Sequence, residues 1–115
     1  MIAVIFEVYP HEEHKLEYLD IAASLKPVLE QVDGFISVER FQSLTDPKKL
    51  LSISFFENED ALEEWRNVMA HRNAQRKGRQ DLFDDYRIRV SHVLRDYGMN
   101  EREEVPADSK AAHSS

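Results

Sequence analysis

The stretch FISVERFQSLTDPKKLLSISFFE, residues 35–57, decides the fold. Apolar and polar residues alternate over 35–43 and again over 50–57, which is the period of a β-strand with two unlike faces. Between these segments, Thr45-Asp46-Pro47-Lys48 has the composition of a turn. The stretch therefore predicts an antiparallel hairpin.

A helical pattern flanks this hairpin on each side. From about His11 to Val32 the apolar residues recur every three or four positions, as in an amphipathic helix, and Asp33-Gly34 is a typical stop signal. Pro27 lies inside the pattern, so we expect it to kink the helix or divide it in two. After the hairpin, Asn58 is the expected N-cap of a second helix, whose apolar face includes Trp65.

Strand patterns lie outside the two helices. One runs from Ile2 to Tyr9 and is closed by Pro10, and the other runs from Tyr86 to Leu94. The order strand, helix, strand, strand, helix, strand predicts an α+β fold, a ferredoxin-like βαββαβ sandwich with a four-stranded antiparallel sheet. We assign this domain to residues 1–98. Residues 99–115 are polar and without periodicity, and we expect a disordered C-terminal tail.

Composition restricts the class of protein. The chain has 115 residues, of which 42% are hydrophobic and 32% charged, as expected for one globular domain. Its net charge of -7 argues against nucleic acid or an anionic membrane as a partner. Without cysteine it has no disulfide and no thiolate metal site. No apolar run approaches the ~20 residues of a membrane span, and no signal peptide is evident, so a cytoplasmic protein is expected.

The sheet face away from the helices predicts a homodimer. Two helices can cover only one face of a four-stranded sheet, and alternate strand positions supply apolar residues to the other face. Representative residues are Ile5, Val38 and Ile53. An exposed apolar face of that size exceeds what a monomer usually carries, so we expect it to be buried against a second copy.

Over about residues 1–98 the sequence resembles the antibiotic biosynthesis monooxygenase family. The resemblance is carried by the strand segments 2–8, 34–41 and 51–57, by 61–66 leading to His71-Arg72, and by Gly78-Arg79, Phe83 and 86–90. It implies a dimeric α+β barrel, in which two ferredoxin-like sheets pack together. For the oxygenase members it also implies attack of dioxygen on an electron-rich aromatic substrate, with no metal and no flavin.

Such chemistry needs a dry pocket, a base near a phenol, and a cation to hold the phenolate. We expect this pocket between the sheet and the second helix. Trp65 and Tyr86 would form its walls, His71 would exchange the proton, and Arg72 or Arg40 would hold the anion of a small-molecule substrate. On an ideal helix His71 lies about 120° from Trp65, so the two share a cavity only if the helix ends near residue 70.

Each of these residues also has an ordinary structural interpretation. Trp65 is in phase with Leu62, Val68 and Met69, as a core residue would be, and arginines are usually solvated at the surface. His11 and His14 have a spacing that permits metal binding, but no third ligand is in view, so no metal site is expected.

Two alternative functions stay open. Haem-degrading members of the fold resemble this chain in the second-helix tryptophan, but Glu7 stands at the likely position of their first-strand asparagine, and Gln75 stands where their iron-binding histidine would be. The other alternative is a non-catalytic dimeric module that binds a ligand.

Overall fold

The computed structural model describes residues 1–75 and 82–108, with side chains for 1–69 and 82–108. Its elements follow the predicted order, with one additional 3-10 turn, η1. They are β1 (Ile2–Pro10), η1 (Glu12–His14), α1 (Lys15–Leu29), β2 (Phe35–Gln42), β3 (Leu50–Phe56), α2 (Glu59–Gln75) and β4 (Phe83–His92).

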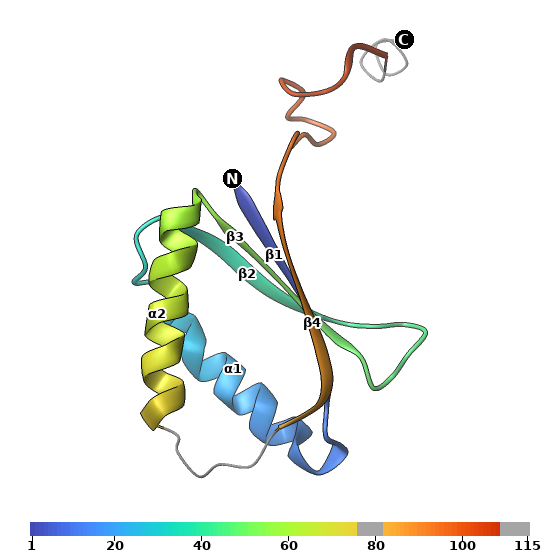
Figure 1. Ribbon diagram of the computed structural model, residues 1–115. Coiled ribbons are helices and arrows are strands. Elements are labelled where there is room, and N and C mark those ends of the chain that lie inside the picture. The colour runs from blue at the N-terminus through green and yellow to red at the C-terminus, as the bar shows by residue number, and fades with distance from the viewer. Residues whose placement is uncertain (76–81, 109–115) are drawn as a thin grey trace.

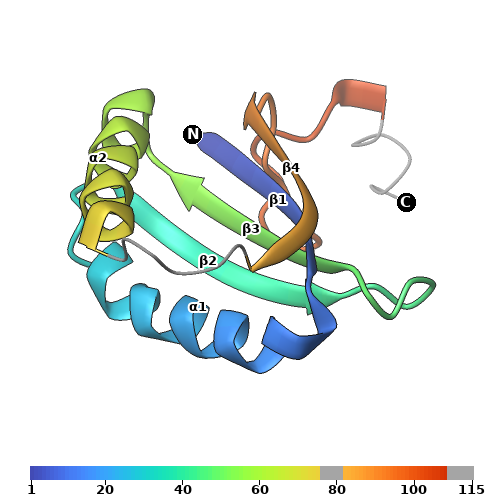
Figure 2. The same cartoon turned by 60° about the horizontal axis from the view of Figure 1, so that its bottom comes forward.

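The four strands form one sheet in the order β2-β3-β1-β4, and every neighbouring pair is antiparallel. Both helices lie on one side of this sheet (Figure 1). Figure 2 shows α1 running along β2, while α2 stands at the end opposite the β2–β3 hairpin. The predicted ferredoxin-like α+β sandwich is confirmed.

The helix boundaries follow from local chemistry. α1 runs through Pro27 without being divided, because the proline lies in the last turn and removes only one intrahelical hydrogen bond. The chain then turns at Gly34, whose φ of 90° suits glycine. Asn58 caps α2 as predicted, since its Oδ1 accepts a hydrogen bond from the Ala61 backbone N–H at 2.9 Å.

The core is divided into two clusters on the helix side of the sheet. We call them cluster 1 and cluster 2. Cluster 1 contains Ile2, Leu29, Val32, Phe56, Ala61 and Leu62. Cluster 2 contains Val8, Tyr18 and Leu50. In β3 the two ends, Leu50 and Phe56, are buried, and every residue between them is partly exposed although β3 is an interior strand.

A bulge in β2 reverses part of the predicted face assignment. Phe35 pairs with Phe56 and Ser37 pairs with Phe55, so Ile36 is an extra residue in β2. Both Phe35 and Val38 therefore pack against cluster 1. The prediction that Val38 lies on the face away from the helices is wrong. On that face β2 presents Ser37, Glu39 and Phe41 instead.

The segment after β4 leaves the sheet and extends beyond the N-terminus (Figure 1). Val93 is still tied to the sheet by its backbone N–H, which donates to the Met1 carbonyl at 3.0 Å. Farther along, Gly98 N–H donates to the Glu101 carbonyl at 2.8 Å, and the Arg102 guanidinium lies 5.7 Å from the centre of the Tyr97 ring. Residues 96–105 thus form local turns.

Candidate functional site

Two rows of paired residues cross the four strands on the helix-side face of the sheet, between cluster 1 and cluster 2. We call the surface that they form the mid-sheet surface. The rows are Arg40–Ser52–Phe6–Ile88 and Val38–Ser54–Val4–Val90. The two serines are small and stand on an interior strand, where a larger apolar residue would normally fill the space under a helix. None of the eight side chains is fully buried.

β4 supplies the most open part of the helix-side face. Tyr86, Ile88 and Val90 are 56%, 54% and 51% exposed, respectively. They alternate along the strand and stand opposite Val8, Phe6 and Val4 of β1. The start of β4 meets α1, where the Phe83 ring lies 5.4 Å from that of Tyr18, and these three half-exposed side chains follow beyond that contact. Figure 2 shows β4 continuing from there toward the side of the sheet opposite α2. The arrangement is an apolar surface beside the core, the kind of surface on which an apolar ligand can be buried.

Trp65 and Tyr86, the two aromatic residues predicted to form the pocket walls, both lie on the helix side of the sheet but next to different clusters. Trp65 is partly buried and packs against cluster 1. Tyr86 makes edge-on ring contacts with Phe6 and Phe83, at centroid separations of 5.8 and 5.9 Å. Phe6 and Phe83 pack against cluster 2. The two aromatics therefore flank the mid-sheet surface rather than touch each other.

His71 and Arg72 belong to α2, but their side chains lie outside the described residues. The helix continues to Gln75 instead of ending near residue 70. On an ideal helix the position of His71 is therefore about 120° around the axis from that of Trp65. Their roles stay predictions.

Arg40 faces the helices from β2 and interacts with Tyr18 of α1. Tyr18 is 7% exposed, and burial raises the pKa of its hydroxyl, while the charge and hydrogen bond of Arg40 act in the opposite direction. The Nε atom of Arg40 is buried and has no hydrogen-bond partner. The sequence singled out Arg40 but not Tyr18, because the contact depends on how α1 lies over β2.

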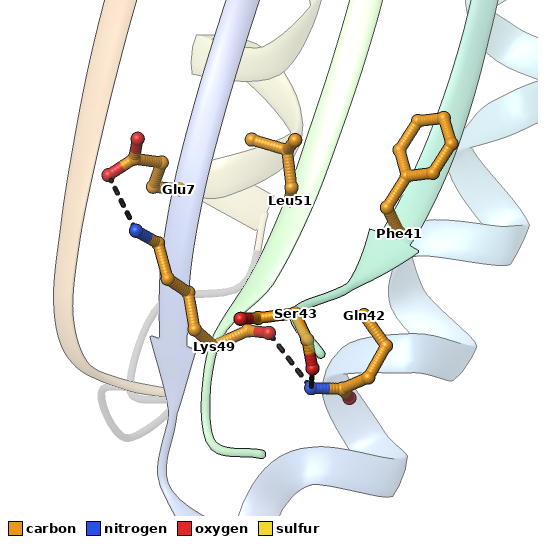
Figure 3. Close-up of a pocket in the computed structure, with 6 residues that line it drawn as sticks. All are labelled: Glu7, Phe41, Gln42, Ser43, Lys49 and Leu51. Carbon is orange, nitrogen blue, oxygen red and sulfur yellow. Dashed lines mark hydrogen bonds and ion pairs between the residues drawn. The ribbon is translucent and has the colours of Figure 1, made fainter. Parts of the chain in front are cut away.

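A hollow of about 250 Å³ lies on the opposite face of the sheet, which we call the open face. Its lining residues are Glu7, Phe41, Gln42, Ser43, Lys49 and Leu51 (Figure 3). This is not the predicted position between the sheet and α2.

Glu7 is the one carboxylate in this hollow and it is paired with two cations. Its carboxylate lies 3.3 Å from Lys49 Nζ and 3.0 Å from Arg89 Nη1. Burial tends to raise the pKa of Glu7, but the hydrogen bonds and charges of Lys49 and Arg89 outweigh it and hold the pKa below its usual value. A carboxylate in that state is a weak base.

Glu7 and its neighbour Phe6 lie on opposite faces of the sheet. The register places Glu7 opposite Leu51, on the open face, whereas Phe6 faces the helices. Within residues 1–75 and 82–108, no three His, Cys, Asp or Glu residues are grouped as metal ligands. His11 instead pairs with Asp84, and His14 with Glu17.

Among the described residues, no helix is both long enough and apolar enough to cross a membrane.

Comparison with known proteins identifies the family. Residues 1–77 match the family model described as antibiotic biosynthesis monooxygenase. A jasmonate monooxygenase of Pyricularia oryzae is 43% identical over 105 residues, which cover 91% of this chain and 49% of that protein. The chain thus spans about half the length of this relative.

Solved structures share the fold at low sequence identity. Rv0793 of Mycobacterium tuberculosis has a TM-score of 0.71 at 18% identity, covering 84% of this chain and 98% of that one. The haem degrader MhuD of the same organism, with two haems bound in its active site, has a TM-score of 0.65 at 16% identity, covering 85% and 100%. These structures support the fold, and the family model and the relative support the conclusion that the chain belongs to the antibiotic biosynthesis monooxygenase family.

Proposed function

We propose that the protein is a monooxygenase that oxidises an aromatic or phenolic small molecule with dioxygen and without a cofactor. The observation that carries the proposal is the mid-sheet surface, where the core is interrupted and apolar side chains of β4 are half exposed. A flat aromatic ring would cover these side chains and exclude water from the reacting atoms. Family membership supports monooxygenase-type chemistry.

The reaction needs a proton acceptor and an oxidant. In the proposed step, an activated methylene group of the substrate loses a proton, and the resulting anion gives its electrons to dioxygen as a carbon–oxygen bond forms. The methylene group becomes a carbonyl, and the second oxygen atom leaves as water with the two hydrogens. We assign proton transfer to His71, because an imidazole exchanges a proton near neutral pH. Its position on α2 lies about 120° around the axis from that of Trp65, so it would approach the substrate from another side than the tryptophan.

Oxygen uptake by metal-free protein tests this assignment. We expect turnover with a panel of anthrones, whose ring methylene group is activated, and a loss of roughly 100-fold in His71→Ala, as is usual for a removed general base. His92→Ala is the matched control, since His92 is exposed at the end of β4. Activity that disappears with a chelator and returns with iron or haem would refute the cofactor-free mechanism. Ligand binding without oxygen uptake would instead support a non-catalytic module.

We further propose that two copies pack through their open faces. Ile5, Leu51, Ile53 and Phe55 are partly exposed on this face, and Phe41 is 43% exposed. A contiguous apolar surface of this kind marks an interaction site.

Charges at the two edges of the open face favour one arrangement of the dimer. Arg89, Ile5, Ile53 and Glu39 form one row across all four strands, with the arginine at the β4 edge and the glutamate at the β2 edge. A two-fold axis parallel to the strands would place β4 of one copy over β2 of the other. Arginine would then face glutamate at both ends of the interface.

A further inference from the structure

Arg40 is the one permanently charged side chain among the described residues that face the helices from the four strands. It is partly buried, and its neighbours across the mid-sheet surface are Ser52 of β3 and Phe6 of β1. Ser52 is small, so it fills little of the space beside the arginine on this face. A charge in such surroundings needs a partner, because an uncompensated charge is costly to bury.

The part of the chain that the structure describes provides Arg40 with an incomplete set of partners. Tyr18 interacts with the guanidinium through its hydroxyl, which is a neutral group. Arg40 Nε is buried and donates no hydrogen bond. No carboxylate of a described residue forms an ion pair with Arg40, whereas Glu7 on the opposite face is paired with both Lys49 and Arg89. Among the described residues, Arg40 is thus a charged donor group without an anionic partner.

We propose that the mid-sheet surface binds a monocarboxylate, whose carboxylate group is held by Arg40 beside the Tyr18 hydroxyl. A guanidinium presents its N–H groups as a planar fork that matches the two oxygens of a carboxylate. The rest of the ligand would lie over Phe6, Ile88 and Val90, which are apolar. A single cation in an apolar setting suits a monoanion better than a phosphate dianion, whose second charge would be uncompensated. The inference rests on the proposed function for the location of the site, and it specifies the ligand as an organic acid, whether aromatic or aliphatic.

The assignment changes the role of Tyr18. Its hydroxyl would serve as a second donor to the carboxylate, in addition to its contact with Arg40. Such a donor must stay protonated, and burial favours the protonated form by raising the pKa of Tyr18. Tyr18 is then a specificity residue, although it lies in α1 and within a core cluster.

Pairs of ligands that differ only in the carboxylate test the proposal. We would titrate the protein with jasmonate and its methyl ester, and with 4-hydroxybenzoate and its methyl ester, and follow the fluorescence of Trp65, the single tryptophan. Wild-type protein should bind at least one acid roughly 10- to 100-fold more tightly than its ester, the range expected for hydrogen bonds to a charged group. Arg40→Gln should remove this preference, Tyr18→Phe should reduce it, and Arg40→Lys should retain part of it.

Arg95→Gln is the matched control, because it removes the same charge from an exposed position outside the sheet. It should keep the wild-type preference, and circular dichroism should show that all variants are folded. The proposal is overturned if ester and acid bind equally well, if Arg40→Gln keeps the preference, or if Trp65 responds to none of the four compounds. Acid-selective binding without oxygen uptake would retain this inference while refuting the monooxygenase assignment.

Discussion

Replacing Gly34 by alanine should destabilise the protein through two effects that the structure separates. Gly34 has a φ of 90°, where a residue with a Cβ is strained by about 1–2 kcal/mol. A Cβ at this position would also lie 2.9 Å from the Cβ of Ala61, which is buried on α2. Overpacking of this kind costs about 1–3 kcal/mol, and the stiffer unfolded chain offsets up to about 1 kcal/mol. We expect a net loss of about 2–3 kcal/mol.

Urea unfolding followed by Trp65 fluorescence and circular dichroism measures this loss. Gly98→Ala is the matched control, since Gly98 has no positive φ and no atom within 4 Å of an added Cβ. The double variant Gly34→Ala with Ala61→Gly should recover the steric part of the loss but not the backbone part. Equal free energies of unfolding for Gly34→Ala and Gly98→Ala would refute the reasoning.

Three further changes test other parts of the structure. Ile53→Asp should give monomers or insoluble protein, because it places a charge in the middle of the open face; a wild-type mass of one subunit by light scattering at micromolar concentration would contradict the dimer. Lys49 and Arg89 lower the folded-state pKa of Glu7 below its unfolded value of 4.5. The ion pairs therefore stabilise the folded state above pH 4.5, and this stabilisation is lost as the pH falls through the folded-state pKa. Thermal unfolding at a series of acid pH values should therefore show a smaller decline for Glu7→Gln than for wild type, and parallel declines would argue against the pairing. Asn58→Ala should cost about 1 kcal/mol by removing the N-cap of α2, as chemical denaturation would show, and a change within experimental error would count against the cap.

The order of the elements was readable from the sequence because each depends on local patterns. The alternation in residues 35–57 predicts the hairpin without knowledge of the rest of the chain, and Asn58 signals the start of α2 through a contact three residues away. The side of the sheet on which Val38 lies could not be read in this way. One extra residue at Ile36 changes the alternation, and neither glycine nor proline marks that bulge.

The candidate site was only partly predictable, since it is built from residues that meet through tertiary structure. Trp65 and Arg40 were identified by residue type, and both lie on the helix side of the sheet. The pairing of Arg40 with Tyr18 depends on where α1 crosses β2, which no sequence spacing encodes. Ser52 and Ser54 carry little chemical signal of their own. Their importance follows from their position on an interior strand between two core clusters.

A ligand bound as proposed at the mid-sheet surface would extend the protein interior between cluster 1 and cluster 2. A molecule bound between cluster 1 and cluster 2 would shield the half-exposed side chains of β4 from water. Binding to the native state alone adds about 2.7 kcal/mol of stability at a ligand concentration 100 times Kd. Compounds could accordingly be ranked by the increase in melting temperature that they cause, before any turnover is known. The physiological substrate should be among the compounds that raise it most.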